Sequence, residues 1–317
     1  MIMDIKNILI LSMIKGIGPA FIKKNSHRLS LDVSCDSIIR EAKPEELDNL
    51  HHYTKVADEI ITDCEINKIK MLSIIDADYP SQLKEISDPP SILFLRGNQK
   101  LLNNVVAIIG TRHSSDLGNK IAERVGTYFS KHFSICNGLV EGIDEHSIYH
   151  DGHVLPNVVG ILSGGLCFEE TCSVNHIRVI KDVLNAGGLI ISEFFPRQKE
   201  DQYSGSKASR IQAGLSQCLI LIQSKVDGGS KYTLAKYSKL GRPIGVIHYP
   251  TSEEYFSDSF SANRLIIDKG KEGLAQMLGL KKSTTLDIGP LIALSSKVDY
   301  DSLIQKVTTK DKTTLFD

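Results

Sequence analysis

The sequence predicts an α/β protein with a Rossmann-like, doubly wound and mainly parallel sheet, preceded by a small helical domain. From about residue 67, short apolar runs alternate with helical patterns, which is typical of a parallel sheet wrapped by helices. Almost every run ends in Gly, Ser, Asn or a charged residue, so polar loops should gather along one edge of the sheet. The first 66 residues are instead helical and polar in pattern.

Length and composition agree with a globular protein of more than one domain. The 317 residues are 41% hydrophobic and 24% charged, with a net charge of −1. We expect a helical domain over 1–66, the Rossmann-like domain over 67–280 and a short tail over 281–317. No apolar run reaches a membrane-spanning length, so we expect a cytoplasmic protein without a membrane partner. The six scattered cysteines form no C-x-x-C pair and are expected to be reduced and mostly buried.

The helical region contains a glycine-rich break. Gly16-Ile17-Gly18-Pro19 should end the first helix, and Pro44 should begin a later one. A Gly-Ile-Gly turn between helices is similar to a SAM or helix-hairpin-helix unit, whose backbone N–H groups can face a phosphate. The region is acidic, however, which favours a packing role for the turn over a DNA contact.

Eight apolar runs are the strand candidates of the larger domain. They cover 71–75, 92–95, 105–109, 134–136, 158–162, 189–191, 218–223 and 243–247. The clearest is 105–109, because it breaks at Gly110 into the polar loop 111–115 and is followed by an apolar stripe at a spacing of four. Ligands of open α/β sheets bind at the carboxyl ends of strands, so this loop should line a site, unless it is only a strand-to-helix turn.

Glycine recurs in the loops that should share this edge. Glycine lets a backbone approach a ligand closely, and free N–H groups suit phosphates. The loops are 110–112, 137–144, 163–165, 192–193 and 227–230.

Local charge suggests where an anion could bind. Residues 197–242 hold nine Lys or Arg against three Asp or Glu, a balance of 9 − 3 = +6, although such a run can also be a solvated helix face. Tyr203, Tyr232 and Tyr237 are the aromatic side chains available for stacking on bases, and Tyr237 is also placed to pack in the core.

Ordered motifs across about 70–275 resemble the bacterial DNA-processing protein A family (DprA, also called Smf). The segments that carry the resemblance are Tyr79-Pro80-Ser81-Gln82-Leu83, Ala107-Ile108-Ile109-Gly110-Thr111-Arg112, Asn137-Gly138-Leu139 with Gly142-Ile143-Asp144, Gly188-Leu189-Ile190-Ile191-Ser192-Glu193, Ala213-Gly214-Leu215-Ser216, Gly229-Ser230 with Thr233, Gly241-Arg242 and Asn263-x-Leu265-Ile266.

The resemblance implies a homodimeric Rossmann-like protein that binds single-stranded DNA and hands it to a RecA-type recombinase during natural transformation. It implies no reaction and no cofactor. Arg112 would meet DNA phosphate, since arginine engages phosphate with two hydrogen bonds. The expected DNA-binding residues are Gly110, Thr111, Arg112, Ser114, Gly138, Lys207, Arg210, Gly229, Ser230, Lys231, Thr233 and Asn263.

Departures from the family pattern fall on the expected binding edge. Ala208-Ser209-Arg210 stands where the family has Arg-Asn-Arg, and 228–234 departs from Ser-Gly-Ser-Leu-Ile-Thr-Ala. One arginine is lost and Lys231 is gained, so the DNA affinity could differ from the family's. The tail is also too short for the winged-helix module that many members carry.

Two other functions stay open. The glycine-rich edge is similar to that of nucleotide-binding phosphoribohydrolases, but Ala235 or Lys236 stands where their catalytic glutamate belongs. Asp144 and Glu193 could supply a carboxylate, or could simply fix loops. The histidines give no metal-binding spacing, and we expect no metal site. A further hypothesis is that the protein is a divergent paralogue that acts only through protein partners.

Overall fold

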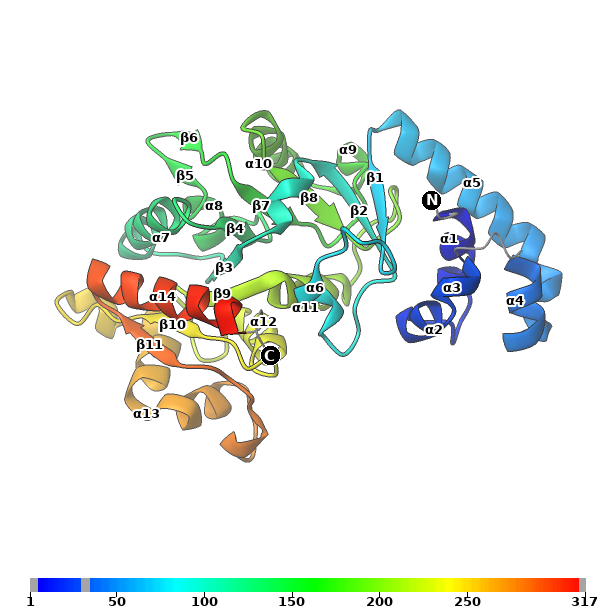
Figure 1. Ribbon diagram of the computed structural model, residues 1–317. Helices are drawn as coiled ribbons and strands as arrows, with labels where there is room; N and C mark the ends of the chain where they lie inside the picture. Colours follow the sequence, from blue (N-terminus) through cyan, green and yellow to red (C-terminus); the bar gives the residue numbers. More distant parts are fainter. Residues whose placement is uncertain (1–4, 30–34, 314–317) are drawn as a thin grey trace.

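The computed structural model describes residues 5–29 and 35–313, and the side chains as far as residue 308 (Figure 1). Helices at the N-terminal end are followed by an α/β unit built on a nine-stranded sheet. No helix in these described ranges has the length and apolar character needed to cross a bilayer.

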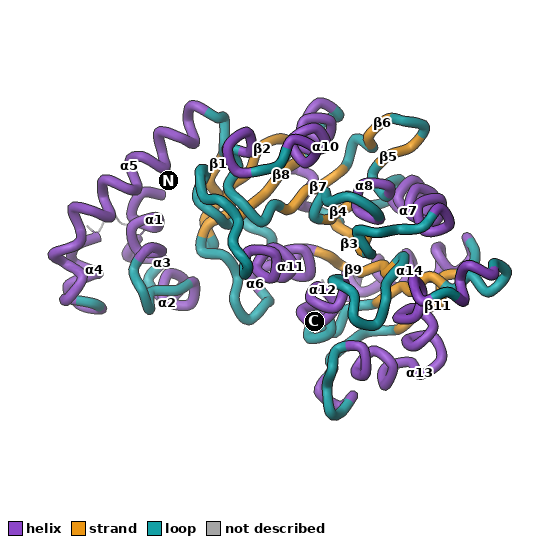
Figure 2. Tube along the Cα trace, turned by 180° about the vertical axis from the view of Figure 1, so that it is seen from behind, coloured by secondary structure: helices purple, strands orange, loops and turns teal. Residues whose placement is uncertain are grey.

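The N-terminal helices pack against the β1 end of the sheet, and Figures 1 and 2 show them there from both sides. Gly16 has a φ of +91°, and Pro19 follows Gly18 as the first residue of α2, which confirms the predicted break. Helix α1 contacts α5 and both β1 and β2, so it is buried along most of its surface. The elements are α1 (Ile5–Met13), α2 (Pro19–Lys24), α3 (Ser26–Leu29), α4 (Cys35–Ala42), the 3-10 helix Pro44–Asn49 and α5 (Leu50–Ile66).

The sheet has the order β1-β2-β8-β7-β4-β3-β9-β10-β11. Strands β1 and β2 run antiparallel to their neighbours, and all other pairs are parallel, as the mainly parallel prediction requires. The eight predicted strands are present, with ends shifted by up to two residues. The strands are β1 (Lys70–Ser73), β2 (Ile92–Gly97), β3 (Val105–Ile109), β4 (Ser134–Asn137), β7 (Val158–Ile161), β8 (Leu189–Ser192), β9 (Ser216–Leu221), β10 (Ile244–Ile247) and β11 (Leu291–Leu294).

Helices cover both faces of the sheet (Figure 1). Helices α7 (Asp116–Phe129) and α10 (Val174–Asn185) lie on one face. The opposite face carries α6 (Ser81–Lys84), α11 (Ser204–Leu215), α12 (Ser230–Tyr237) and α13 (Ser261–Met277). The strand order reverses at β3, which has β4 on one side and β9 on the other.

The segment after residue 280 belongs to the same sheet. It supplies β11, which pairs with β10, and α14 (Lys297–Thr313). Tyr300, Leu303 and Val307 are buried at helical spacing, and the Tyr300 ring contacts Tyr128 and Phe129 of α7. Neither element was predicted from the sequence, where 281–317 was expected to be a short tail; α14 is mostly polar.

A second element that the sequence analysis missed is a small hairpin of β5 (Tyr149–His150) and β6 (His153–Val154). Its two turn residues, Asp151 and Gly152, have φ values of +49° and +76°. An Asp-Gly pair with positive φ at both positions is the preferred two-residue turn between antiparallel strands.

The cysteines are all free, and five of the six are buried. Burial raises the pKa of the Cys136 and Cys218 thiols, which keeps them protonated. Both findings confirm the prediction of buried, reduced thiols.

Candidate nucleic-acid interface

The loop between β3 and α7 is held on both sides by neighbouring loops. The Thr111 N–H donates to the Gln223 carbonyl at 2.9 Å, and the Ile143 N–H donates to the Thr111 carbonyl at 3.1 Å. Gly110 is needed here, because a Cβ would lie 2.4 Å from the Ile143 side chain. The predicted loop therefore contacts the loops that follow β4 and β9, at the point where the strand order reverses.

Gln223 ties this loop to the first turn of α7. Its side chain accepts from the Ser115 N–H at 3.0 Å and donates to Ser115 Oγ at 2.8 Å. Ser115 in turn caps α7 by accepting from the Gly118 N–H. Gln223 has no exposed surface, so it is a buried organiser of the loop, which the sequence analysis did not single out.

Arg112 is the exposed cation that this framework presents. Its guanidinium makes no hydrogen bond or ion pair with any described residue. Gly142, with a φ of +84°, packs so closely that a Cβ there would lie 2.5 Å from the Arg112 carbonyl. The backbone of Arg112 is thus fixed while its side chain remains available to an anion.

The loop after β4 is built around a buried carboxyl group. Asp144 accepts from the Gly138 N–H at 2.9 Å, which explains how the half-buried Gly138 is held. Burial raises the pKa of Asp144 to about 7, opposed by hydrogen bonds from the Gly138 and Val140 backbone and by the charge of Arg112. Asp144 therefore fixes the loop, as one reading of the sequence expected, and lies within electrostatic reach of Arg112.

Arg210 forms a largely buried ion pair with Glu193. Its two terminal nitrogens donate to the two Glu193 carboxylate oxygens at 2.7 Å each, and its Nε donates to Asp88 at 3.2 Å. The side chains of Arg210 and Glu193 are only 12% and 14% exposed. Arg210 is thus engaged in holding α11 against the β8 loop, whereas Lys207, one turn earlier, is exposed above the Phe194 ring.

The remaining predicted contacts differ in accessibility. Gly229 is exposed before α12 and Lys231 is half-buried, whereas Ser230 and Thr233 are buried. Asn263 has no exposed surface, and its amide bonds the Ser224 N–H and the Ile222 and Ile247 carbonyls. The structure thus corrects the assignment of Asn263, because a side chain whose hydrogen-bonding groups are satisfied in the core cannot contact DNA directly.

The basic stretch 197–242 is less positive in space than in sequence. Acidic residues from other segments form ion pairs with Arg197, Arg210, Lys225 and Arg242. Tyr203 and Tyr232 are exposed by 65% and 55%, while Tyr237 is buried and donates to the Pro243 carbonyl. The packing role of Tyr237 is therefore confirmed, and Tyr203 and Tyr232 remain available for stacking.

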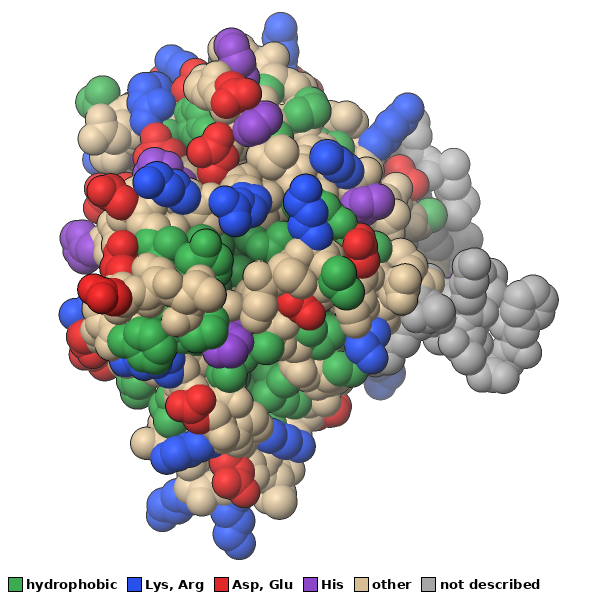
Figure 3. Space-filling view, turned by 90° about the vertical axis from the view of Figure 1, so that its left-hand side faces the viewer, with side chains coloured by type: hydrophobic (Ala, Val, Ile, Leu, Met, Phe, Trp, Pro, Cys, Tyr) green, Lys and Arg blue, Asp and Glu red, His purple; other side chains and the backbone are tan. Residues whose placement is uncertain are grey.

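Figure 3 shows how charge is spread over one face of the molecule. Several Lys and Arg side chains lie in a row across its upper half, with hydrophobic and uncharged side chains below them and acidic groups interspersed. This face is not uniformly basic, in agreement with the net charge of −1. Strong phosphate binding would therefore depend on a few positioned cations.

The fold is that of a Rossmann-like α/β protein whose glycine-rich loops lie at the carboxyl ends of the parallel strands, the edge at which open α/β sheets bind ligands. A family model described as DNA recombination-mediator protein A matches residues 70–279. The chain belongs to this DprA/Smf family of recombination mediators, which confirms the family resemblance seen in the sequence.

Curated relatives are similar to this chain over more than half of its length. DNA processing protein DprA of Bacillus subtilis is 28% identical over 179 residues, 56% of this chain and 59% of that protein. DprA of Streptococcus pneumoniae is 29% identical over 184 residues, 58% of this chain and 64% of that protein. Protein Smf of Escherichia coli is 30% identical over 193 residues, 57% of this chain and 50% of that protein. The aligned segments thus span less than two thirds of these relatives.

Two solved structures share the fold. DprA of Streptococcus pneumoniae superposes with a TM-score of 0.67 at 22% identity, covering 95% of this chain and 93% of that chain. DNA processing protein A of Helicobacter pylori, described as having a unique single-stranded DNA binding mode, gives a TM-score of 0.55 at 24% identity over 64% of this chain and 88% of that chain. The likeness supports the α/β sheet, and the first structure also spans the N-terminal helices.

Proposed function

We propose that this protein binds single-stranded DNA along the loops at the carboxyl edge of its sheet, with Arg112 as the principal phosphate contact. The observation that carries the proposal is the exposed guanidinium of Arg112, which pairs with no described residue and is presented by a loop that Gln223, Ile143 and Ser115 hold in place. Lys207 and Lys231 are additional cations beside the loops, and Tyr203 and Tyr232 offer exposed rings on which bases can stack.

In the same proposal the bound strand is handed to a RecA-type recombinase during natural transformation, and the active form is a homodimer without catalytic activity of its own. Family membership and the single-stranded DNA binding described for the Helicobacter pylori relative support this function. Both candidate carboxylates of the enzyme alternative are engaged, since Glu193 pairs with Arg210 and Asp144 holds Gly138. Recombinase transfer is tested by RecA ATPase activity on protein-coated strands, and the dimer by light scattering.

DNA binding is tested by fluorescence anisotropy of labelled single-stranded and duplex oligonucleotides at several salt concentrations. We expect preferential binding of the single strand, and Arg112→Ala should weaken it and reduce the logarithmic salt slope by about 0.7, the value for one phosphate contact. Arg40→Ala, at an exposed arginine of α4, is the matched control and should change neither quantity. Equal affinities of wild type and Arg112→Ala would remove Arg112 from the interface, and no binding at low salt would overturn the proposal.

A further inference from the structure

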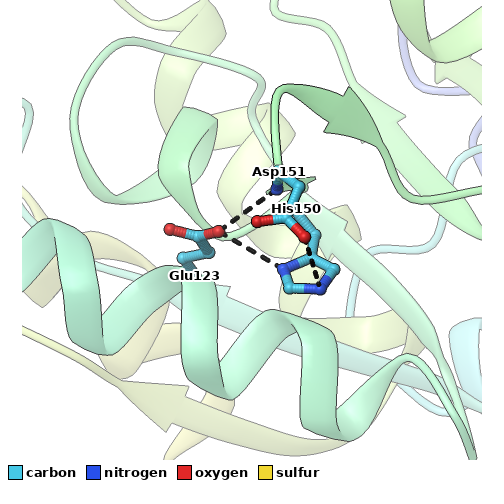
Figure 4. Close-up of side chains that lie close together, drawn as sticks. All are labelled: Glu123, His150 and Asp151. Atoms are coloured by element: carbon cyan, nitrogen blue, oxygen red, sulfur yellow. Dashed lines mark hydrogen bonds and ion pairs between the residues drawn. The ribbon is translucent and has the colours of Figure 1, made fainter.

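A histidine and two carboxylates meet on the surface between α7 and the β5–β6 hairpin (Figure 4). Glu123 projects from α7, His150 ends β5 and Asp151 begins the turn. Glu123 Oε1 lies 3.3 Å from His150 Nδ1, and Asp151 Oδ2 lies 3.6 Å from His150 Nε2. One ligand atom from each of the three residues lies within 4.8 Å of the others.

The hairpin that carries His150 and Asp151 is anchored to helices on both sides. Glu123 also accepts from the Asp151 N–H at 3.4 Å, which brings the turn against α7. On the other side of the hairpin, the Tyr149 hydroxyl donates to Asp182 of α10 at 2.8 Å. The hairpin is therefore held between α7 and α10, with its turn against Glu123.

The charge of the cluster calls for a cation. The neighbouring cation Arg178 is already paired with Glu145 and Asp182. Glu123 lies against Nδ1 and Asp151 against Nε2 of the same imidazole, so two negative charges flank one ring and a bound cation would balance them.

We propose that Glu123, His150 and Asp151 form a binding site for a divalent transition metal ion of the Zn²⁺ type. Zinc bonds of about 2.0–2.2 Å to imidazole and carboxylate place neighbouring ligand atoms about 3–4 Å apart, a spacing that the Glu123–His150 contact already has. The imidazole ligand favours Zn²⁺, Ni²⁺ or Cu²⁺ over Mg²⁺ and Ca²⁺.

Space for the remaining ligands lies beside the cluster. A pocket of about 340 Å³ is lined by Glu123, Glu145, His146, Tyr149, Gly152 and Arg178. Because the three protein ligands leave coordination positions open, water would complete the metal sphere on this side. Bound metal would cross-link the hairpin to α7, the helix whose first turn carries the Ser115 cap of the Arg112 loop.

The site is tested on full-length, tag-free protein that has been treated with a chelator and dialysed. Titration with ZnCl₂ by calorimetry should give one site, and CoCl₂ should give a visible absorption band from the bound ion. His150→Ala and Glu123→Gln should each weaken Zn²⁺ binding at least tenfold and abolish the Co²⁺ band. His132→Ala, an exposed histidine outside the cluster, is the matched control and should leave both signals unchanged.

Circular dichroism establishes that each variant is folded, so a lost signal reports the ligand and not the fold. The melting temperature of wild type, but not of His150→Ala, should rise on adding Zn²⁺, because the ion binds only the folded cluster. Unchanged Zn²⁺ affinity in His150→Ala would show adventitious binding at other histidines and overturn the proposal. Absence of any binding to the wild type would overturn it equally. Neither outcome depends on DNA, so the site can fail while the proposed function stands.

Discussion

Arg210 and Glu193 form a bidentate ion pair that joins α11 to the loop after β8. Bidentate pairs of this kind fix geometry as well as charge, and this one is largely shielded from solvent. The one arginine that this chain keeps from the family's Arg-Asn-Arg motif is therefore occupied in a structural contact, and Arg112 is left as the accessible arginine of the edge.

We predict that Arg210→Ala lowers the free energy of unfolding by about 3 kcal/mol, because it leaves the Glu193 carboxylate buried without its partner. Urea denaturation measures the change, with Arg40→Ala as the exposed control. The double variant Arg210→Leu/Glu193→Leu should recover part of the loss, since no unpaired charge remains. If Arg210→Ala were as stable as wild type, the Arg210–Glu193 ion pair would not form in solution.

Asp144 should make stability depend on pH. Its pKa of about 7 in the folded protein exceeds the ordinary value of about 3.9, so the folded state holds more protons between these values. The free energy of unfolding should therefore fall as pH rises from about 4 to 7, by at most about 1.4 kcal/mol per unit from this group. Asp144→Asn keeps an oxygen for the Gly138 N–H and should flatten this slope. Urea titrations at several pH values test this, with the exposed Glu141→Gln as control; an identical slope in Asp144→Asn would contradict it.

Gln223 should control the order of the Arg112 loop. Gln223→Leu removes both hydrogen bonds to Ser115 but leaves the backbone bond from Thr111. We expect faster amide hydrogen exchange over 111–118 and, if the proposed interface is right, weaker single-stranded DNA binding with the Arg112 side chain intact. Unchanged exchange in this segment would mean that the backbone contacts suffice.

Asn263 should matter for stability and not for DNA contact. Asn263→Ala leaves the buried Ser224 N–H and two carbonyls without their partner, which should destabilise the fold by about 2 kcal/mol. The folded fraction should keep its DNA affinity in anisotropy titrations. A selective loss of affinity at unchanged stability would return Asn263 to the interface.

The strands of the larger domain were predictable because burial on both faces leaves continuous apolar runs such as Val105–Ile109. The Gly-rich loops were predictable because the glycines themselves mark them in the sequence, and the structure explains two of them, since close contacts at Gly110 and Gly142 leave no room for a side chain. Both signals lie within a few consecutive residues.

The partners of the charged side chains were not predictable, because they come from distant segments. Arg210 meets Asp88, 122 residues earlier in the chain, and Glu123 meets His150 across 27 residues. The excess of basic residues over 197–242 was therefore a poor measure of the charge presented in space. Asn263 was misassigned for a related reason, since only the fold reveals that it is buried.

The pairing of β11 with β10 means that the end of the family match at residue 279 is not the end of the folding unit. A chain cut there would expose the unpaired backbone of β10 and uncover the Tyr128 and Phe129 rings, which Tyr300 now contacts. Open strand edges recruit other chains, so the shortened protein should self-associate in size-exclusion chromatography, whereas a stable monodisperse product would show that the last strand is dispensable. We therefore expect that pairing of β10 with β11 keeps the protein from associating with other copies of itself.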